Sequence, residues 1–245
     1  TKRKQEWYRE YLNGQGVKPL AFIGKFTLDS NILEVASDIS RVIGINNDLR
    51  QQAKNHAEFI RLLTKACEQE GITLLRTGIV GNNTRRPLNV REFRGFAISD
   101  LIAPLILINS KDAPAAQIFT IIHELAHLWI NKSGISNLSS LYENSTAPNT
   151  EFSSVEIFCN QVAAETLVPK DELATYWNRL ETPTDQLQTI ARRFWVSTIV
   201  ILRRALDNQL ITKKRFFELY ELEISKQTNV SKQGSGGDFY NTSWV

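Results

Sequence analysis

The feature that most constrains the fold is an apolar, helix-like segment that carries three ionisable side chains. Residues 118–129 contain a His-Glu-x-x-His motif, and nearly every other residue there is apolar, so the helix is expected to be buried on most sides. Burying an unpaired imidazole or carboxylate is costly. The rest of the chain must therefore supply partners for these three groups.

The spacing within the motif predicts a metal site. Because an α-helix turns about 100° per residue, His123 and His127 lie one above the other on the same face. Both imidazoles can then bind one zinc ion. Glu124 is offset by one residue, which puts its carboxylate beside the metal, where a general base for water is needed. The alternative is a buried helix with two hydrogen-bonded histidines and no metal.

A catalytic zinc ion takes three protein ligands and keeps one position open. The only other histidine of the chain is His56, far upstream. Glu156 is the preferred third ligand, because it shares a helix face with Asn160, which could hydrogen-bond a ligand histidine. Glu151 and Glu165 are the rival carboxylates.

The other periodicities predict an α+β fold with a small three-stranded sheet. Strand-like runs cover residues 72–77, 93–99 and 105–109, and residues 78–88 and 135–150 are typical of loops. Apolar residues at three- and four-residue steps predict helices over residues 3–13, 32–43, 48–70, 112–132, 151–168, 184–194, 198–207 and 213–224. Expected helix N-caps are Asp29 or Ser30, Asp112 and Ser197.

This pattern divides the chain into four parts. Residues 1–47 form an N-terminal helical segment, residues 48–180 the core with the metal motif, residues 181–226 a helix-turn-helix-like subdomain, and residues 227–245 a flexible tail. The subdomain is basic, through Arg192, Arg193, Arg203, Arg204, Lys213, Lys214 and Arg215. A solvated charged face is the favoured interpretation, and direct DNA contact is the alternative.

Composition gives no support for two classes of partner. Lys and Arg total 29 against 26 for Asp and Glu, and this excess is too small to indicate a nucleic acid or membrane surface as partner. The longest apolar run, residues 101–108, contains Pro104 and is shorter than the about 20 residues of a membrane span. Cys67 and Cys159 lie in helix-like patterns, so we expect both to be reduced and buried in a cytoplasmic protein.

Three segments resemble the ImmA/IrrE family of metallo-endopeptidases: residues 92–97, 119–127 and 156–169. The resemblance implies a zincin-like core, in which the sheet packs on the metal-bearing helices. It further implies that His123, His127 and Glu156 bind Zn²⁺ and that Glu124 is the catalytic base. Ala126 and Val168 depart mildly from the family pattern, at positions that do not touch the chemistry.

The resemblance also implies a substrate and a role. Family members cleave helix-turn-helix repressors and thereby relieve repression of mobile elements or of a stress response. Residues 1–70 contain no repressor-like domain, so we expect the repressor to be a separate protein encoded nearby. The ending at residues 236–240 resembles a point after which family chains continue, which is consistent with truncation.

We therefore expect a zinc-dependent endopeptidase. An extended substrate could add to an edge strand at residues 93–99 or 105–109. Tyr142 and Arg94 are the candidate oxyanion-stabilising or substrate-binding side chains. Two other functions remain open: a DNA-binding regulator with a structural metal, and a protein that binds the repressor without cutting it.

Overall fold

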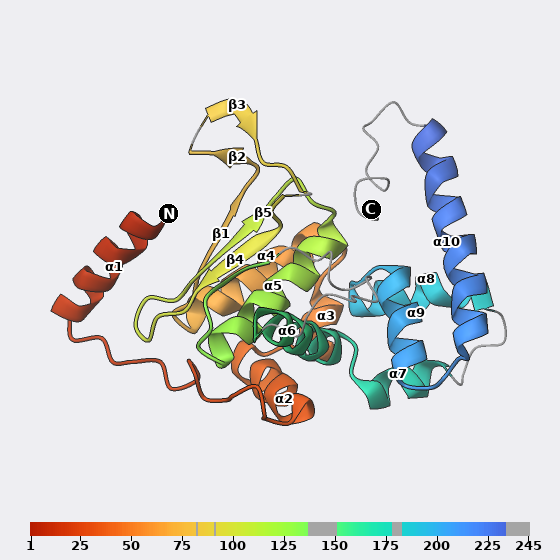
Figure 1. Cartoon of the computed structure of the whole chain (residues 1–245), viewed down its shortest axis with the longest axis horizontal. Helices are drawn as coiled ribbons and strands as arrows, with labels where there is room; N and C mark the ends of the chain where they lie inside the picture. Colours follow the sequence, from red (N-terminus) through yellow and green to blue (C-terminus); the bar gives the residue numbers. More distant parts are fainter. Residues whose placement is uncertain (82, 91, 137–150, 178–182, 234–245) are drawn as a thin grey trace. The chain divides into compact units, whose positions relative to one another are not determined.

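A computed structural model describes residues 1–81, 83–90, 92–136, 151–177 and 183–233 of the chain (Figure 1). The chain forms two compact units, Thr1–Thr166 and Leu167–Val245. None of the described helices is long and apolar enough to cross a membrane.

A mixed sheet forms the centre of the first unit. Its strands are β1 (Thr73–Thr77), β4 (Gly95–Ile98), β5 (Leu105–Asn109) and β6 (Gly134–Ser136), in the order β1-β5-β4-β6. Strand β5 is parallel to β1 and antiparallel to β4, and β4 is antiparallel to β6. The three expected strands are present, and the short β6 joins them. The expectation that β4 or β5 offers a free edge is wrong, because each has a neighbour on both sides.

A second correction concerns the polar stretch after β1, which was expected to be a loop. It forms a hairpin of β2 (Ile79–Val80) and β3 (Asn83–Pro87), which pair antiparallel. Gly81, with a φ of 55°, lies at the turn, where a left-handed backbone favours glycine. Every residue of β3 is exposed, so no alternation of apolar and polar residues marks the strand.

The helices of this unit are α1 (Lys2–Gly14), α2 (Ile32–Ile43), α3 (Asn47–Gln52), α4 (His56–Gln69), α5 (Pro114–Trp129) and α6 (Glu151–Leu167). Helices α4 and α5 lie together on one face of the sheet, α4 over β1 and α5 over β4 and β5 (Figure 1). Helix α2 packs against α5. Every residue of α5 from Gln117 to Trp129 is buried, as its apolar sequence predicts.

Asparagine caps account for two differences from the predicted helices. The long helix expected over residues 48–70 is wrong, because Asn55 starts a new helix by accepting a hydrogen bond from the Glu58 amide at 2.9 Å. Helix α2 is capped by Asn31 instead of Asp29 or Ser30. Both asparagine side chains accept a hydrogen bond from an amide of the first turn, which starts the helix at that position.

The start of α5 also differs from the prediction. Ala113 is its N-cap and Pro114 occupies the first turn, where a missing amide costs nothing. Asp112 does not cap the helix, because its carboxylate accepts from the Ala113 amide at 2.8 Å and pairs with Arg94. Cys67 and Cys159 are free and buried, as expected.

The second unit is helical among its described residues. It contains α7 (Lys170–Trp177), α8 (Pro183–Phe194), α9 (Thr198–Asp207) and α10 (Lys213–Gln233), with α9 in contact with both α8 and α10. Helix α7 was not expected. Helix α10 continues to Gln233, past its expected end at residue 224, so residues 227–233 are helical where a flexible tail was expected. Residues 234–245 lie outside the described part.

The basic residues of this unit are not all solvated. Arg204 is buried, and its Nε donates to the Val168 carbonyl at 3.1 Å, which corrects its assignment to a charged surface. Arg193 lies 4.0 Å from the centre of the Tyr176 ring. Ser197 caps α9 by accepting from the Val200 amide at 3.3 Å, as predicted.

Candidate metal centre

The motif helix and α6 bring three metal-ligating side chains together. Nε2 of His123 lies 3.1 Å from Nε2 of His127. Both nitrogens face the carboxylate of Glu156. Nε2 of His123 lies 3.2 Å from Oε2, and Nε2 of His127 lies 3.3 Å from Oε1. The three residues are at most 4% exposed. Among the described residues, these are the ones whose arrangement could hold a metal ion.

The C-terminal end of α5 determines which nitrogen of His127 faces Glu156. Asn131 adopts a left-handed φ of 51°, and the Lys132 amide donates to the His127 carbonyl at 3.0 Å. The chain reversal places the Lys132 carbonyl 3.1 Å from Nδ1 of His127. A carbonyl only accepts hydrogen bonds, so Nδ1 must carry a proton. In the neutral ring, Nε2 is then a lone-pair donor, as a metal ligand must be.

The three converging side chains need a positive charge between them. A neutral imidazole nitrogen and a carboxylate oxygen are both hydrogen-bond acceptors, so they repel each other unless a cation lies between them. Although burial lowers the pKa of His127, hydrogen bonds with Cys159 and Glu156 raise it to about 11. Burial raises the pKa of Glu156, but hydrogen bonds with His123 and His127 lower it to about 2. Both shifts favour a positive charge beside the Glu156 carboxylate.

Glu124 lies outside the three converging side chains, on the side of α5 that faces the sheet. The residue is fully buried. A Cβ built on Gly95 of β4 would stand 3.0 Å from its Oε1. The carboxylate is therefore held between the helix and the strand, one residue along from His123, rather than among the ligand atoms.

Comparison with known proteins gives the family. Residues 67–206, more than half of the chain, match the IrrE N-terminal-like domain family of peptidases, Peptidase_M78. The chain belongs to this family. No curated protein matches it. Membership confirms the expected resemblance to ImmA/IrrE and makes the chain a member of a metallopeptidase family.

The donor set fits the metal that such a peptidase needs. Two imidazole nitrogens and one carboxylate oxygen form a ligand set used by catalytic zinc, with a fourth position left open. Oε1 of Glu156 is buried and has no hydrogen bond of good geometry among the described residues. A bound cation would give this oxygen a partner.

The other predicted site residues are placed as follows. Asn160 is buried one turn after Glu156, but its Oδ1 has no hydrogen-bond partner in the described part of the chain. Its bond to a ligand histidine stays a prediction. Nη1 of Arg94 pairs with Asp112 at 3.1 Å, and Tyr142 lies outside the described residues. The oxyanion roles of these two residues also stay predictions.

Two of the other candidates for the third ligand do not join the three converging side chains. His56 is the first residue of α4, and Glu165 lies in α6, nine residues after Glu156; neither is in the metal group. The side chain of Glu151 is not among the described ones. Sequence reasoning missed the Lys132 carbonyl and the Gly95 contact. The Gly95 contact has a signal in the sequence, a glycine inside a strand-like run, which often marks a close approach.

Proposed function

We propose that this protein is a zinc-dependent endopeptidase. One observation carries the proposal: in a member of a metallopeptidase family, three buried ligand atoms converge within 4.8 Å and a fully buried carboxylate lies one residue away. A structural metal site has no need of Glu124 beside it. A hydrolase does, because water must lose a proton as it attacks a peptide bond.

Different residues of the chain would bind the metal and transfer the proton. His123, His127 and Glu156 would hold the ion, with His127 oriented by the Lys132 carbonyl. A bound zinc ion would polarise the scissile carbonyl and lower the pKa of a water molecule. Glu124 would accept the proton of the attacking water and pass it to the departing amine. Its place between α5 and β4 keeps the carboxylate in one position for both transfers.

For the substrate, we propose a helix-turn-helix repressor encoded near this protein, in the cytoplasm. The resemblance of residues 92–97, 119–127 and 156–169 to ImmA/IrrE peptidases supports this proposal. Cleavage would relieve repression of a mobile element or of a stress response. The same resemblance supports a zincin-like core and a helix-turn-helix-like arrangement of α8 and α9.

The decisive experiment combines the zinc-loaded protein with the neighbouring repressor and follows the repressor by gel and mass spectrometry. The wild type should cut it at a defined bond. Glu124→Gln should bind zinc normally and leave the repressor intact, because the amide cannot accept the proton. Glu34→Gln is the matched control on an exposed helix residue, and it should cut like the wild type.

Two outcomes would overturn the proposal. An intact repressor after incubation with zinc-loaded wild type would exclude it as substrate. If Glu124→Gln relieved repression as well as the wild type does in a reporter assay, the protein would act by binding the repressor. Protein–DNA binding without cleavage would instead favour the DNA-binding regulator with a structural metal.

A further inference from the structure

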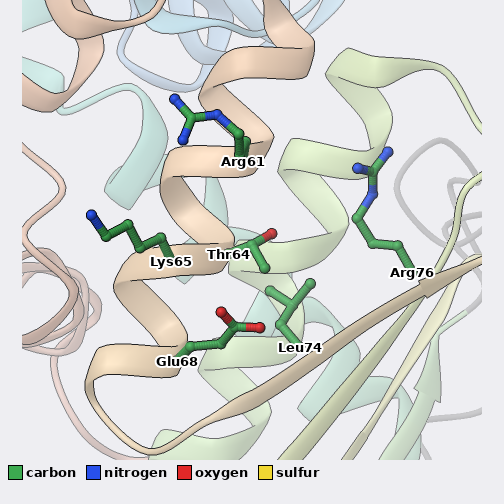
Figure 2. A pocket seen from close by; sticks show the side chains of 6 residues that line it. All are labelled: Arg61, Thr64, Lys65, Glu68, Leu74 and Arg76. Carbon is green, nitrogen blue, oxygen red and sulfur yellow. The ribbon is translucent and has the colours of Figure 1, made fainter.

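A groove with mostly basic polar side chains lies between α4 and β1 of the first unit. Its lining residues are Arg61, Thr64, Lys65 and Glu68 from α4, and Leu74 and Arg76 from β1. Figure 2 shows the four α4 side chains along the helix, with Leu74 of β1 beside them and Arg76 further along the strand. The groove shares no residue with the metal ligands or with Glu124.

Strand β1 is an edge of the sheet among the described residues. The Thr73 amide donates to the Pro104 carbonyl at 3.0 Å, and the Thr77 carbonyl accepts from the Ser110 amide at 2.9 Å. The amide and carbonyl of successive residues point to opposite edges of a strand. Those of Thr73 and Thr77 point toward β5, so those of Leu74 and Arg76 point away from it. The amides and carbonyls of these two residues can pair with another strand.

The side chains of Leu74 and Arg76 show which face of the sheet carries the groove. Leu74 is buried under α4, and Arg76 donates from Nε and Nη2 to Gln117 of α5, at 3.1 and 2.8 Å. Both side chains therefore lie on the helix-covered face. Every second side chain of a strand added beside β1 would lie on that face, next to the α4 residues that line the groove.

The charge of the lining determines what the added strand should carry. Arg61, Lys65 and Arg76 are opposed by one lining carboxylate, Glu68. Arg61 also pairs with Glu58, but at 3.6 Å on an exposed helix face, where such a pair contributes little. Lys65 forms no ion pair with any described residue. The groove therefore favours carboxylates on the incoming strand.

We propose that this groove binds an extended acidic segment of a protein partner, which adds to the sheet as a strand beside β1. Backbone hydrogen bonds to Leu74 and Arg76 would supply affinity, and carboxylates facing Arg61 and Lys65 would supply selectivity. The proposal does not depend on peptidase activity. The groove lies at β1, and β5 separates β1 from β4, the strand that Glu124 contacts.

The test uses the full chain and three fluorescein-labelled octapeptides. The probe alternates glutamate with valine. A second peptide replaces glutamate with lysine, and a third keeps the glutamates but has alternate backbone amides N-methylated, on the edge that would face β1. Fluorescence anisotropy should show binding of the first peptide only. In NMR spectra of the complex, the amide protons of Leu74 and Arg76 should exchange more slowly than in the free protein.

Charge reversal places the peptide in the groove. Arg61→Glu combined with Lys65→Glu should weaken binding of the glutamate peptide at least about tenfold, because it exchanges attraction for repulsion at two positions. Lys4→Glu, an exposed cation on α1, is the matched control and should bind like the wild type. Hydrolysis of a short peptide that lacks acidic residues should be equal in all three proteins, which separates this result from a failure of the proposed peptidase.

Three results would each overturn the proposal: no binding of the glutamate peptide at millimolar concentration, equal binding by the charge-reversed protein, or equal binding of the N-methylated peptide. The last result would show attraction by charge without addition of a strand.

Discussion

Gly95 and Glu124 approach each other so closely that no side chain fits at residue 95. A Cβ there would stand 3.0 Å from Oε1 of Glu124, and only 2.6 Å from the methyl carbon of Thr120. The φ of Gly95 is not in the left-handed region, so the position needs glycine for space and not for backbone freedom. The absent side chain lets α5 lie against β4 with the Glu124 carboxylate between them.

We therefore predict that Gly95→Ala lowers kcat by about tenfold to a hundredfold with little change in KM, because a displacement of the base by a fraction of an ångström suffices. Zinc content should stay at one ion per chain, because the ligands lie elsewhere. Steady-state kinetics and metal analysis check both parts.

A double variant separates the two clashes. Thr120→Ser removes the methyl group at 2.6 Å and leaves the contact with Glu124 in place. We expect Gly95→Ala alone to lower the thermal midpoint as well as kcat. The double variant Gly95→Ala with Thr120→Ser should recover the thermal midpoint of the wild type but not its kcat. Recovery of both would show that only helix packing matters. Gly14→Ala, where a Cβ meets nothing within 4 Å, is the control for the loss of a glycine.

The positions of the motif residues can be predicted because all of them lie within five consecutive residues of one helix. A spacing of four residues fixes where His123 and His127 lie on any helix, and the apolar neighbours of Glu124 imply burial. Glu156 is different. Its helical face follows from the sequence, but its approach to the imidazoles depends on how α6 packs against α5. Residue spacing does not determine this packing, so the sequence alone leaves Glu151 and Glu165 as alternative third ligands.

Other features escaped prediction for identifiable physical reasons. The three residues of β6 are too few to show alternation, and they become a strand only by pairing with β4. The break between α3 and α4 depends on Asn55, whose side chain is compatible with a helix interior or a cap. The orientation of His127 depends on the carbonyl of Lys132, and every residue carries a carbonyl. Backbone contacts of this kind leave no residue-type signal.

A second prediction concerns Asn131, whose left-handed backbone brings the Lys132 carbonyl to His127. Asn131→Val should lower zinc affinity by about tenfold, because a β-branched residue resists this conformation and the carbonyl moves away. Asn131→Gly should keep the affinity close to that of the wild type, because glycine adopts the conformation readily. Competition with a chelating dye measures both affinities. Equal affinity of the valine variant would contradict the role given to the carbonyl.

A third prediction concerns the carboxylate ligand. Zinc that binds only the folded protein should raise the thermal midpoint of the wild type, with a shift that grows with zinc concentration. Glu156→Gln should lose most of this shift, because an amide is a weaker ligand and brings no charge. Glu165→Gln, on the same helix but outside the cluster, should keep it. Differential scanning fluorimetry with and without zinc compares the three proteins, and an unchanged shift in Glu156→Gln would remove this residue from the ligand set.

The last prediction concerns a buried carboxylate that joins α2 to the C-terminal end of α5. Oδ2 of Asp38 accepts from the indole of Trp129 at 2.9 Å. Its Oδ1 accepts from Lys25 at 2.7 Å and from Arg41 at 2.6 Å. Burial raises the pKa of Asp38, but these three hydrogen bonds outweigh it and the pKa is lowered. The charged carboxylate is therefore the form that stabilises the fold.

Asp38→Asn should lower the free energy of unfolding by about 2 kcal/mol at neutral pH, because hydrogen bonds to a charged group are lost or weakened. A lowered pKa in the folded state means that this stabilisation is complete above the pKa of the unfolded chain, about 3.9, and disappears as the pH falls through the folded value. Urea unfolding of metal-free protein should show a constant difference between wild type and variant from pH 8 to about pH 5, and a shrinking difference below about pH 4. Asp29→Asn, on an exposed residue, should unfold like the wild type throughout. A difference that stays constant into strong acid would show that Asp38 acts through its shape and not through its charge.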